Sequence, residues 1–282
     1  MKVRLWGTRG SVAAPGAETA RFGGNTACVE VRARDGTVVV LDAGTGIRPL
    51  GVALGRSVGR VDVLLTHLHM DHIQGLGFFG PLYDPNVETH LWGPGAAALP
   101  LRTRLSRYLS PPLFPVHLRD LPRLVLHDVP TEPFAVGGLR IAADRVCHPG
   151  FTVGYRIAED GATVAYMTDH EPALGVPRFP LNGEWTSGYD LARDVDLLVH
   201  DAQYTLDEYR ERVGWGHSAI DHALEFARLA GARHLVTFHH DPAHDDDAIE
   251  RLTRAATSAV PVACRVTAGA EGAVFAVGEE DA

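Results

Sequence analysis

Residues 66–72, with the sequence THLHMDH, form the strongest chemical pattern in the chain. They place four candidate metal ligands within six residues, directly after an apolar run that is typical of a buried strand. In an extended chain His67 and His69 point the same way, because successive side chains alternate between two faces. A turn after them would direct Asp71 and His72 to a second point nearby. One short segment can therefore serve two metal ions, and histidines that merely lie at the surface are the weaker interpretation.

Strands and helices alternate around this pattern, as periodicity and turn residues indicate. The predicted strands are Lys2–Trp6, Cys28–Arg34, Thr37–Leu41, Val61–Thr66, Val87–Trp92, Leu139–Val146, Thr152–Ala158, Ala162–Thr168, Val195–His200, Arg233–Phe238 and Gly272–Val277. The predicted helices are Gly46–Arg56, Asp71–Phe79, Ala96–Leu109, Ser218–Ala230 and Asp245–Ala256. The order predicts an α/β protein with a single domain over residues 1–282, built from two halves that each run from strands to helices. The proline-rich segment at about 78–130 is interpreted as an insertion.

Three segments together resemble a known family. They are the pattern at 66–72, the opening Leu5-Trp6-Gly7-Thr8 with Arg9-Gly10-Ser11, and the strand end Leu41-Asp42-Ala43-Gly44-Thr45-Gly46. Over nearly its whole length the chain resembles the metallo-β-lactamase superfamily, and within it the phosphodiesterase branch that includes ribonuclease Z. The resemblance implies an αββα four-layer sandwich with a dinuclear metal site along one edge. The Asp42 carboxylate is expected to orient a ligand histidine or to hold the following turn.

The resemblance also implies a set of metal ligands. Three histidines would hold the first ion, two histidines and an aspartate the second, and one aspartate would bridge them. The first ion would be held by His67, His69 and His148, the second by Asp71, His72 and His239, and the bridging residue would be Asp169. His239 and His240 both end a predicted strand and face opposite ways, so only one can be the ligand. The family pattern favours His239 and leaves His240 as a supporting or substrate-binding group.

A further pair bears on the type of reaction. The segments around Asp201 and His217 resemble the relay of ribonuclease Z, in which an acidic side chain orients a histidine that protonates the leaving alkoxide. Phosphodiester cleavage needs such an acid because an unprotonated alcohol leaves poorly. Asp201 is shorter than the carboxylate usual in that branch. The alternative interpretation makes Asp201 a loop residue and His217 a helix-start residue.

Nitrogen and carboxylate ligands without cysteine suit two zinc ions, with manganese or iron as alternatives. Such ions polarise a phosphoryl oxygen and lower the pKa of a bridging water from about 15.7 toward about 7, which makes a hydroxide nucleophile. The expected function is a metal-dependent hydrolase, a phosphodiesterase that acts on a small or cyclic phosphodiester. The alternatives are a thioester or lactone hydrolase, less readily a β-lactam hydrolase, and a metal-binding or redox-sensing protein without turnover.

Composition limits the partners. The formal net charge of −9 disfavours a large polyanion such as tRNA, and the arm with which ribonuclease Z grips tRNA is not evident. No apolar run is long enough to span a bilayer, and the first residues lack a secretory signal, so we expect a cytoplasmic protein. The three cysteines are too few and scattered for a disulfide framework. A small-molecule phosphodiester is the expected partner, and the sequence leaves a homodimer open.

Overall fold

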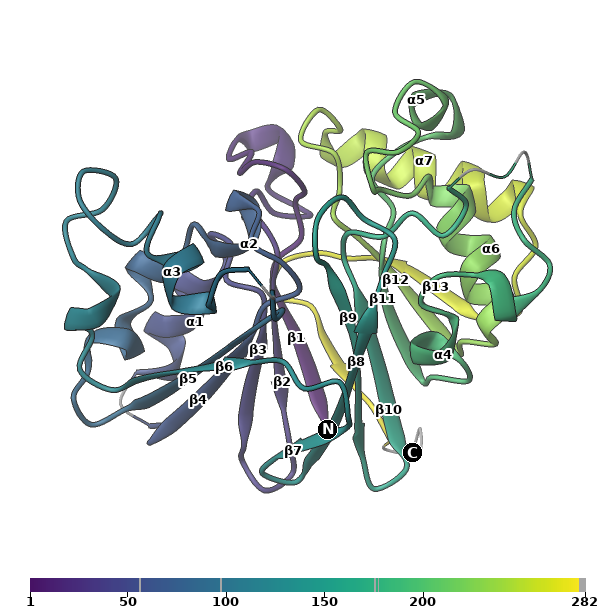
Figure 1. Ribbon diagram of the computed structural model, residues 1–282. Coiled ribbons are helices and arrows are strands. Elements are labelled where there is room, and N and C mark those ends of the chain that lie inside the picture. Colours follow the sequence, from purple (N-terminus) through teal and green to yellow (C-terminus); the bar gives the residue numbers. More distant parts are fainter. Residues whose placement is uncertain (56, 97, 175, 177, 279–282) are drawn as a thin grey trace.

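Two seven-stranded β-sheets pack face to face, and helices cover the outer face of each sheet (Figure 1). The computed structural model describes residues 1–55, 57–96, 98–174, 176 and 178–278. These four layers confirm the αββα sandwich that the sequence predicted. Met1 and the last described residues lie at the same end of the sandwich, where the amino group of Met1 donates a hydrogen bond to the Val277 carbonyl at 3.0 Å.

The first sheet contains the strands of the N-terminal half together with the last strand of the chain. Its order is β14 (Val274–Ala276), β1 (Lys2–Gly7), β2 (Cys28–Arg32), β3 (Val38–Leu41), β4 (Arg60–Leu64), β5 (Glu88–Gly93) and β6 (Leu124–Asp128). The second sheet has the order β13 (Arg265–Ala268), β12 (His234–Phe238), β11 (Leu197–Asp201), β10 (Ala162–Met167), β9 (Val153–Glu159), β8 (Leu139–Arg145) and β7 (Phe134–Val136). Strand β14 therefore returns the C-terminus to the N-terminal sheet.

The core between the sheets follows from the alternation of side chains along each strand. Val3 and Leu5 of β1 are fully buried, whereas Lys2 and Arg4 on the opposite face are exposed. Tyr155 of the second sheet joins the same apolar layer and is also completely buried. Burial of these apolar faces drives the two sheets together.

Two further apolar layers hold the helices against the sheets. The helices α1 (Ile47–Leu54), α2 (Met70–Ile73) and α3 (Leu101–Leu105) pack on the first sheet. The helices α4 (Tyr189–Ala192), α6 (Ile220–Ala230) and α7 (Asp246–Ala259) pack on the second sheet. Helix α5 (Leu206–Arg210) begins with a capping box between Thr205 and Glu208. No helix in the described part of the chain is long and apolar enough to cross a membrane.

Several elements differ from the sequence predictions. The expected helix Asp71–Phe79 ends at Ile73, and Leu76–Phe78 forms a 3-10 helix instead. Between them Gly75 passes so close to Gly44 that a side chain there would collide with the Gly44 carbonyl. The expected helix Ala96–Leu109 is reduced to α3, since Pro100 directly precedes it; Ala97, like Arg56 of another predicted helix, lies outside the described residues.

Five strands and α-helices of the described chain were not foreseen. They are β6, β7, β13 and the short helices α4 and α5. The proline-rich segment at 78–130, interpreted above as an insertion, supplies β5 and β6 and so extends the first sheet.

The carboxyl ends of several parallel strands meet at one edge of the sandwich. Strand β4 pairs in parallel with β3, and β11 pairs in parallel with both β10 and β12. Loops that follow these strands therefore emerge together, which is the usual place for a site in an α/β protein.

Candidate metal centre

Histidine and aspartate side chains from both halves of the chain converge at this edge. Groups of candidate ligand atoms there lie within 4.8 Å of one another; a group of Asp201, His217 and His239 adjoins two larger groups, and Asp169 belongs to both of these. The larger groups are His67, His69, His148 and Asp169, and Asp71, His72, Asp169 and His239. Each of the seven residues that the family resemblance implied as ligands is therefore in the cluster.

Short loops after the strands position these residues. His67 and His69 follow β4, and Asp71 and His72 lie in α2, which begins at the next residue. The other three follow strands of the second sheet, with His148 after β8, Asp169 after β10 and His239 after β12.

Asp169 lies between the two groups. Its Oδ1 is 3.0 Å from His72 Nε2 and 3.3 Å from His239 Nε2. Its Oδ2 is 3.6 Å from His67 Nε2 and 3.8 Å from His148 Nε2. One carboxylate thus faces both groups with different oxygens, as a bridging ligand would.

Four of the five histidines have Nδ1 held by an acceptor elsewhere in the protein. The pairs are His67 with Thr66 Oγ1 at 3.0 Å, His72 with Asp42 Oδ2 at 2.9 Å, His148 with the Gly216 carbonyl at 2.9 Å, and His239 with Gln203 Oε1 at 2.9 Å. The carboxylate of Asp42 and the carbonyl oxygens of Gly216 and Gln203 can only accept, so His72, His148 and His239 carry the proton on Nδ1. The Thr66 hydroxyl donates its proton to Asp42, so it accepts from His67 Nδ1. The Nε2 lone pair of each ring is left for the cluster, which is the arrangement that orients metal-binding histidines.

Asp42 supports the centre from the protein interior through hydrogen bonds. The carboxylate is fully buried and accepts hydrogen bonds from the Thr66 backbone at 2.7 Å and from the Tyr166 hydroxyl at 3.0 Å, besides that from His72. Its backbone has a φ of 59°, which is uncommon outside glycine and is held here by these bonds. Of the two sequence-based alternatives, Asp42 therefore orients His72.

The cluster contains buried polar atoms that no protein group satisfies. Among the described residues, His67 Nε2, His72 Nε2 and Asp169 Oδ1 form no hydrogen bond. The last two are 3.0 Å apart, but both are acceptors while the proton of His72 lies on Nδ1. Buried polar atoms are rarely left in this state, because the loss of hydration is then uncompensated. The atoms point at one another across the cluster, so their donor set fits a divalent cation.

The electrostatics lead to the same conclusion. Burial lowers the pKa of His72, but nearby carboxylates, with Asp169 the strongest, raise it well above its ordinary value. Burial raises the pKa of Asp169, but His239 and His72 hold it well below its ordinary value. The carboxylates thus require positive charge in this buried volume, and without an ion only protonated histidines can supply it.

Two glycines let the loops approach the histidines. A side chain at Gly10 would lie 2.4 Å from His239 Nδ1, and one at Gly216 would lie 2.2 Å from His148 Nδ1. Ser11, which follows Gly10, donates its backbone N–H to Asp71 Oδ2 at 2.8 Å. The Arg9-Gly10-Ser11 segment noted in the sequence therefore lies directly behind the centre.

Asp201 and His217 form the second predicted constellation. His217 Nδ1 donates to Asp201 Oδ2 at 2.7 Å, and the His217 ring stacks on that of His239 with 5.0 Å between centroids. Burial lowers the pKa of His217, but the Asp201 carboxylate raises it more, so that the pKa is about 9. Backbone N–H groups of Gln203 and Ser218 donate to the other oxygen of Asp201 and fix the carboxylate.

Sequence reasoning missed the residue that holds the His217 loop. Glu171 is 1% exposed and accepts hydrogen bonds from the Gly214 and Gly216 backbone, each at 2.8 Å, and from the Tyr209 hydroxyl at 2.9 Å. The loop in turn supplies the carbonyl that orients His148. Nothing in the local sequence around Glu171 marks these partners, which lie about 40 residues further along the chain.

The structure also separates the two consecutive late histidines. His239 Nε2 is 3.2 Å from Asp71 Oδ2, within the cluster. His240 faces away and donates from Nε2 to the Gly269 carbonyl at 2.9 Å, where it is buried. His240 is therefore a structural residue and does not line the centre.

Comparison with known proteins assigns the family. A family model described as "Beta-lactamase superfamily domain" matches residues 37–240, which is more than half of the chain and includes every residue of the cluster. The chain belongs to the beta-lactamase superfamily. It is a metal-dependent hydrolase of this superfamily, and divalent metal binding at the His/Asp cluster follows from this membership together with the donor set.

The relatives of this superfamily member agree with the branch that the sequence indicated. Ribonuclease Z of Myxococcus xanthus (strain DK1622) is 27% identical over 259 residues, which cover 77% of this chain and 82% of the relative. The fold is similar to that of the metallo-beta-lactamase fold protein YhfI from Bacillus subtilis, with a TM-score of 0.69, 19% identity and coverage of 97% and 98%. It is also similar to a diphosphatase of the PhnP family, with a TM-score of 0.68, 18% identity and coverage of 97% and 96%.

Proposed function

We propose that this beta-lactamase superfamily hydrolase is a dinuclear phosphodiesterase that acts on a small or cyclic phosphodiester. The observation that carries the proposal is the Asp201–His217 pair beside the His/Asp cluster. A cluster alone would serve many hydrolases, whereas a carboxylate-held histidine beside it supplies the acid that an alcohol leaving group needs.

The metal ligands in this proposal follow the two groups of the cluster. One ion would be held by His67, His69 and His148, and the other by Asp71, His72 and His239, with Asp169 shared. When bound, the two ions would polarise the phosphoryl group and activate water. Zinc suits the imidazole and carboxylate donors, and manganese or iron are the alternatives.

His217 would protonate the leaving oxygen from Nε2. Its Nδ1 is committed to Asp201, so only Nε2 can face a substrate. In the metal-free protein the Asp201 carboxylate raises the pKa of His217 to about 9 despite burial, and the side chain is about 10% exposed, which allows contact with a bound ester. The pair supports general acid catalysis at the leaving group, which commonly contributes about 10² to 10⁴ in rate.

A second candidate function is cleavage of a tRNA precursor. The observation in its favour is the similarity to ribonuclease Z of Myxococcus xanthus. The net charge of −9 argues against it, because binding of a large polyanion depends on positive charge at the interface. A small phosphodiester therefore remains the preferred substrate.

A thioester or lactone hydrolase is the remaining alternative. It would use the same cluster, but a thioester releases a thiolate that leaves without a proton, so Asp201 and His217 would have no comparable task there. A lactone releases an alkoxide, so the substrate assay separates that case. A metal-binding or redox-sensing protein without turnover would likewise leave this pair without a role.

The test begins with elemental analysis of the purified protein, followed by assays of the metal-loaded protein. The substrates are bis(p-nitrophenyl) phosphate, 2′,3′-cyclic and 3′,5′-cyclic nucleotides, a lactone, a thioester and a tRNA precursor. We expect two equivalents of metal and hydrolysis of the small phosphodiesters, which Asp169→Asn abolishes. Preference for the lactone or thioester, or cleavage of the tRNA precursor alone, would overturn the proposal.

A further inference from the structure

A pocket of about 670 Å³ opens beside the metal centre on the side of the first half of the chain. His67 and His69 form part of its lining, so the pocket is continuous with the cluster. Its volume lies within the range of ordinary small-molecule sites. A substrate that is bound at the cluster can therefore extend into this pocket.

One wall of the pocket is apolar. Met70 and Phe151 are 51% and 41% exposed, and Leu113 is 70% exposed, although all three are large apolar side chains. The Tyr108 hydroxyl donates to the Gln74 carbonyl at 2.6 Å, so its polar atom is already satisfied and the ring contributes apolar surface to the lining. Such a wall gains free energy by covering a flat organic group.

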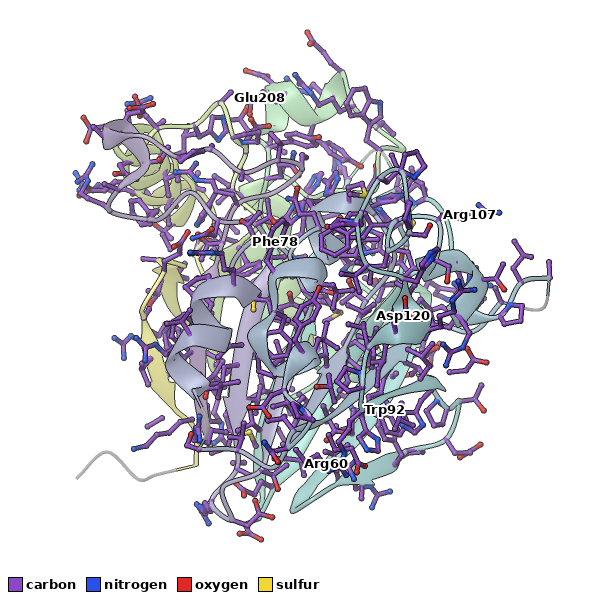
Figure 2. All side chains as sticks on the ribbon, turned by 90° about the vertical axis from the view of Figure 1, so that its left-hand side faces the viewer. Arg60, Phe78, Trp92, Arg107, Asp120 and Glu208 are labelled. Atoms are coloured by element: carbon purple, nitrogen blue, oxygen red, sulfur yellow. The ribbon has the colours of Figure 1, made fainter. Side chains whose placement is uncertain are left out.

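Two arginines from α3 and the residues after it complete the lining. Arg104 donates to the Pro94 carbonyl through Nη2, while its buried Nε has no partner among the described residues. Arg107 is exposed, and Figure 2 shows its side chain at the surface of this half of the molecule. Within the described part of the chain neither guanidinium forms a salt bridge, although acidic residues outnumber basic ones in the protein.

Two guanidinium groups without carboxylate partners in an acidic protein suit an anionic ligand, because guanidinium binds phosphate and carboxylate through charged hydrogen bonds. The scissile phosphodiester belongs at the cluster. The two arginines therefore suit a second negatively charged group of the same substrate. The apolar wall, which lies in the same pocket, suits an organic group of that substrate.

We propose, on the basis of the proposed function, that the pocket binds a nucleotide-type phosphodiester with a second phosphate. The nucleoside packs on the wall formed by Met70, Leu113 and Phe151, and the second phosphate binds Arg107 and Arg104. The scissile phosphodiester thus lies at the cluster, the nucleoside on the apolar wall and the second phosphate at the arginines.

Three probes with one leaving group test the pocket in the metal-loaded protein. They are methyl p-nitrophenyl phosphate, thymidine 5′-(p-nitrophenyl phosphate), and the same thymidine ester with a 3′-phosphate. We expect kcat/KM to rise at least about tenfold with the nucleoside, and about tenfold again with the 3′-phosphate, as one charged hydrogen-bonded pair provides. Equal kcat/KM for the three probes would overturn the pocket assignment and leave the phosphodiesterase proposal intact.

Two variants locate the second phosphate. Arg107→Gln should remove most of the gain from the 3′-phosphate, with little effect on the methyl probe. Arg102→Gln is the matched control, because Arg102 is an exposed arginine of the neighbouring helix α3 that does not line the pocket. Equal losses in both variants would show a general charge effect and contradict the assignment. Leu113→Ala should reduce the gain from the nucleoside.

A binding measurement separates this inference from the proposed activity. Thymidine 3′,5′-bisphosphate, which lacks a diester to cleave, is titrated into each protein by calorimetry. We expect Arg107→Gln to weaken its Kd about tenfold and Arg102→Gln to leave it unchanged. If no diester is hydrolysed but this difference is found, the proposed function fails and the ligand class stands. If thymidine 3′,5′-bisphosphate does not bind to the parent protein, the inference is wrong.

Discussion

Asp42 Oδ2 accepts a hydrogen bond from His72 Nδ1 at 2.9 Å, and both side chains are completely buried. The same oxygen accepts from Tyr166 of the opposite sheet at 3.0 Å. One carboxylate therefore connects both sheets to a histidine of the cluster and sets the direction of its Nε2. Its contribution to metal binding acts through His72, and also through the Thr66 hydroxyl, which donates to Asp42 and lies 3.0 Å from His67 Nδ1.

The first prediction concerns this bond. Asp42→Asn keeps the shape and tolerates the positive φ, but it loses the charge that holds His72. We expect metal affinity to fall about 10-fold to 100-fold, measured by competition with a chromophoric chelator. Asp62→Asn is the control, because Asp62 is equally buried but accepts from Arg60 and Trp92. Equal metal affinity in both variants would contradict the role of Asp42.

The second prediction concerns His217 as the acid. His217→Ala should lower hydrolysis of a phosphodiester with an alkyl alcohol leaving group by about 10² or more, with metal content intact. The loss should be much smaller for p-nitrophenyl esters, because p-nitrophenolate leaves without a proton. His222→Ala, which removes a half-buried histidine of α6, controls for general effects on folding. A loss that does not depend on the leaving group would exclude the acid role.

The third prediction concerns protonation of His217 in the metal-free protein. Its pKa of about 9 is above the ordinary value of 6.5, so the bound proton stabilises the fold fully below about pH 6.5. That stabilisation is lost as the pH rises through 9. Asp201→Asn removes the main cause, and burial should then lower the pKa of His217. Ring ¹⁵N chemical shifts report the pKa directly.

Unfolding measurements give an independent readout of the same linkage. The difference in free energy of unfolding between the parent protein and Asp201→Asn should shrink between pH 6 and pH 10. A constant difference over this range would mean that Asp201 stabilises the fold independently of the proton on His217.

The fourth prediction concerns Glu171 as a positioning residue. Glu171→Gln places an NH₂ group among N–H donors and should release the loop at Gly214 and Gly216. We expect kcat to fall on the order of 10-fold to 100-fold with a smaller change in KM, because His217 loses its position. The exposed Glu184→Gln serves as the control. Unchanged kcat, or unchanged His217 ring signals, would contradict the positioning role.

The sequence by itself determined the parts of this protein that depend on local geometry. The spacing of residues 66–72 directs His67 and His69 to one point and Asp71 and His72 to another, because strand and turn geometry fix those directions within a few residues. The two halves that each run from strands to helices were also predictable, since apolar periodicity marks the buried faces of strands and helices, whereas the αββα sandwich followed from the family resemblance. The family resemblance added His148, Asp169 and His239, which come from distant parts of the chain.

Only the tertiary structure decided the relationships that depend on how distant strands pack. Glu171 holds a loop about 40 residues away, Gln203 orients His239, and the pocket combines residues from α2, from α3 and from the loop before β9. The strands β6 and β13 are partly exposed and lie at or near sheet edges, so they lack the regular apolar pattern that marks a buried strand. Contacts between segments far apart in the sequence leave no local periodicity, and for that reason they could be found only in the folded chain.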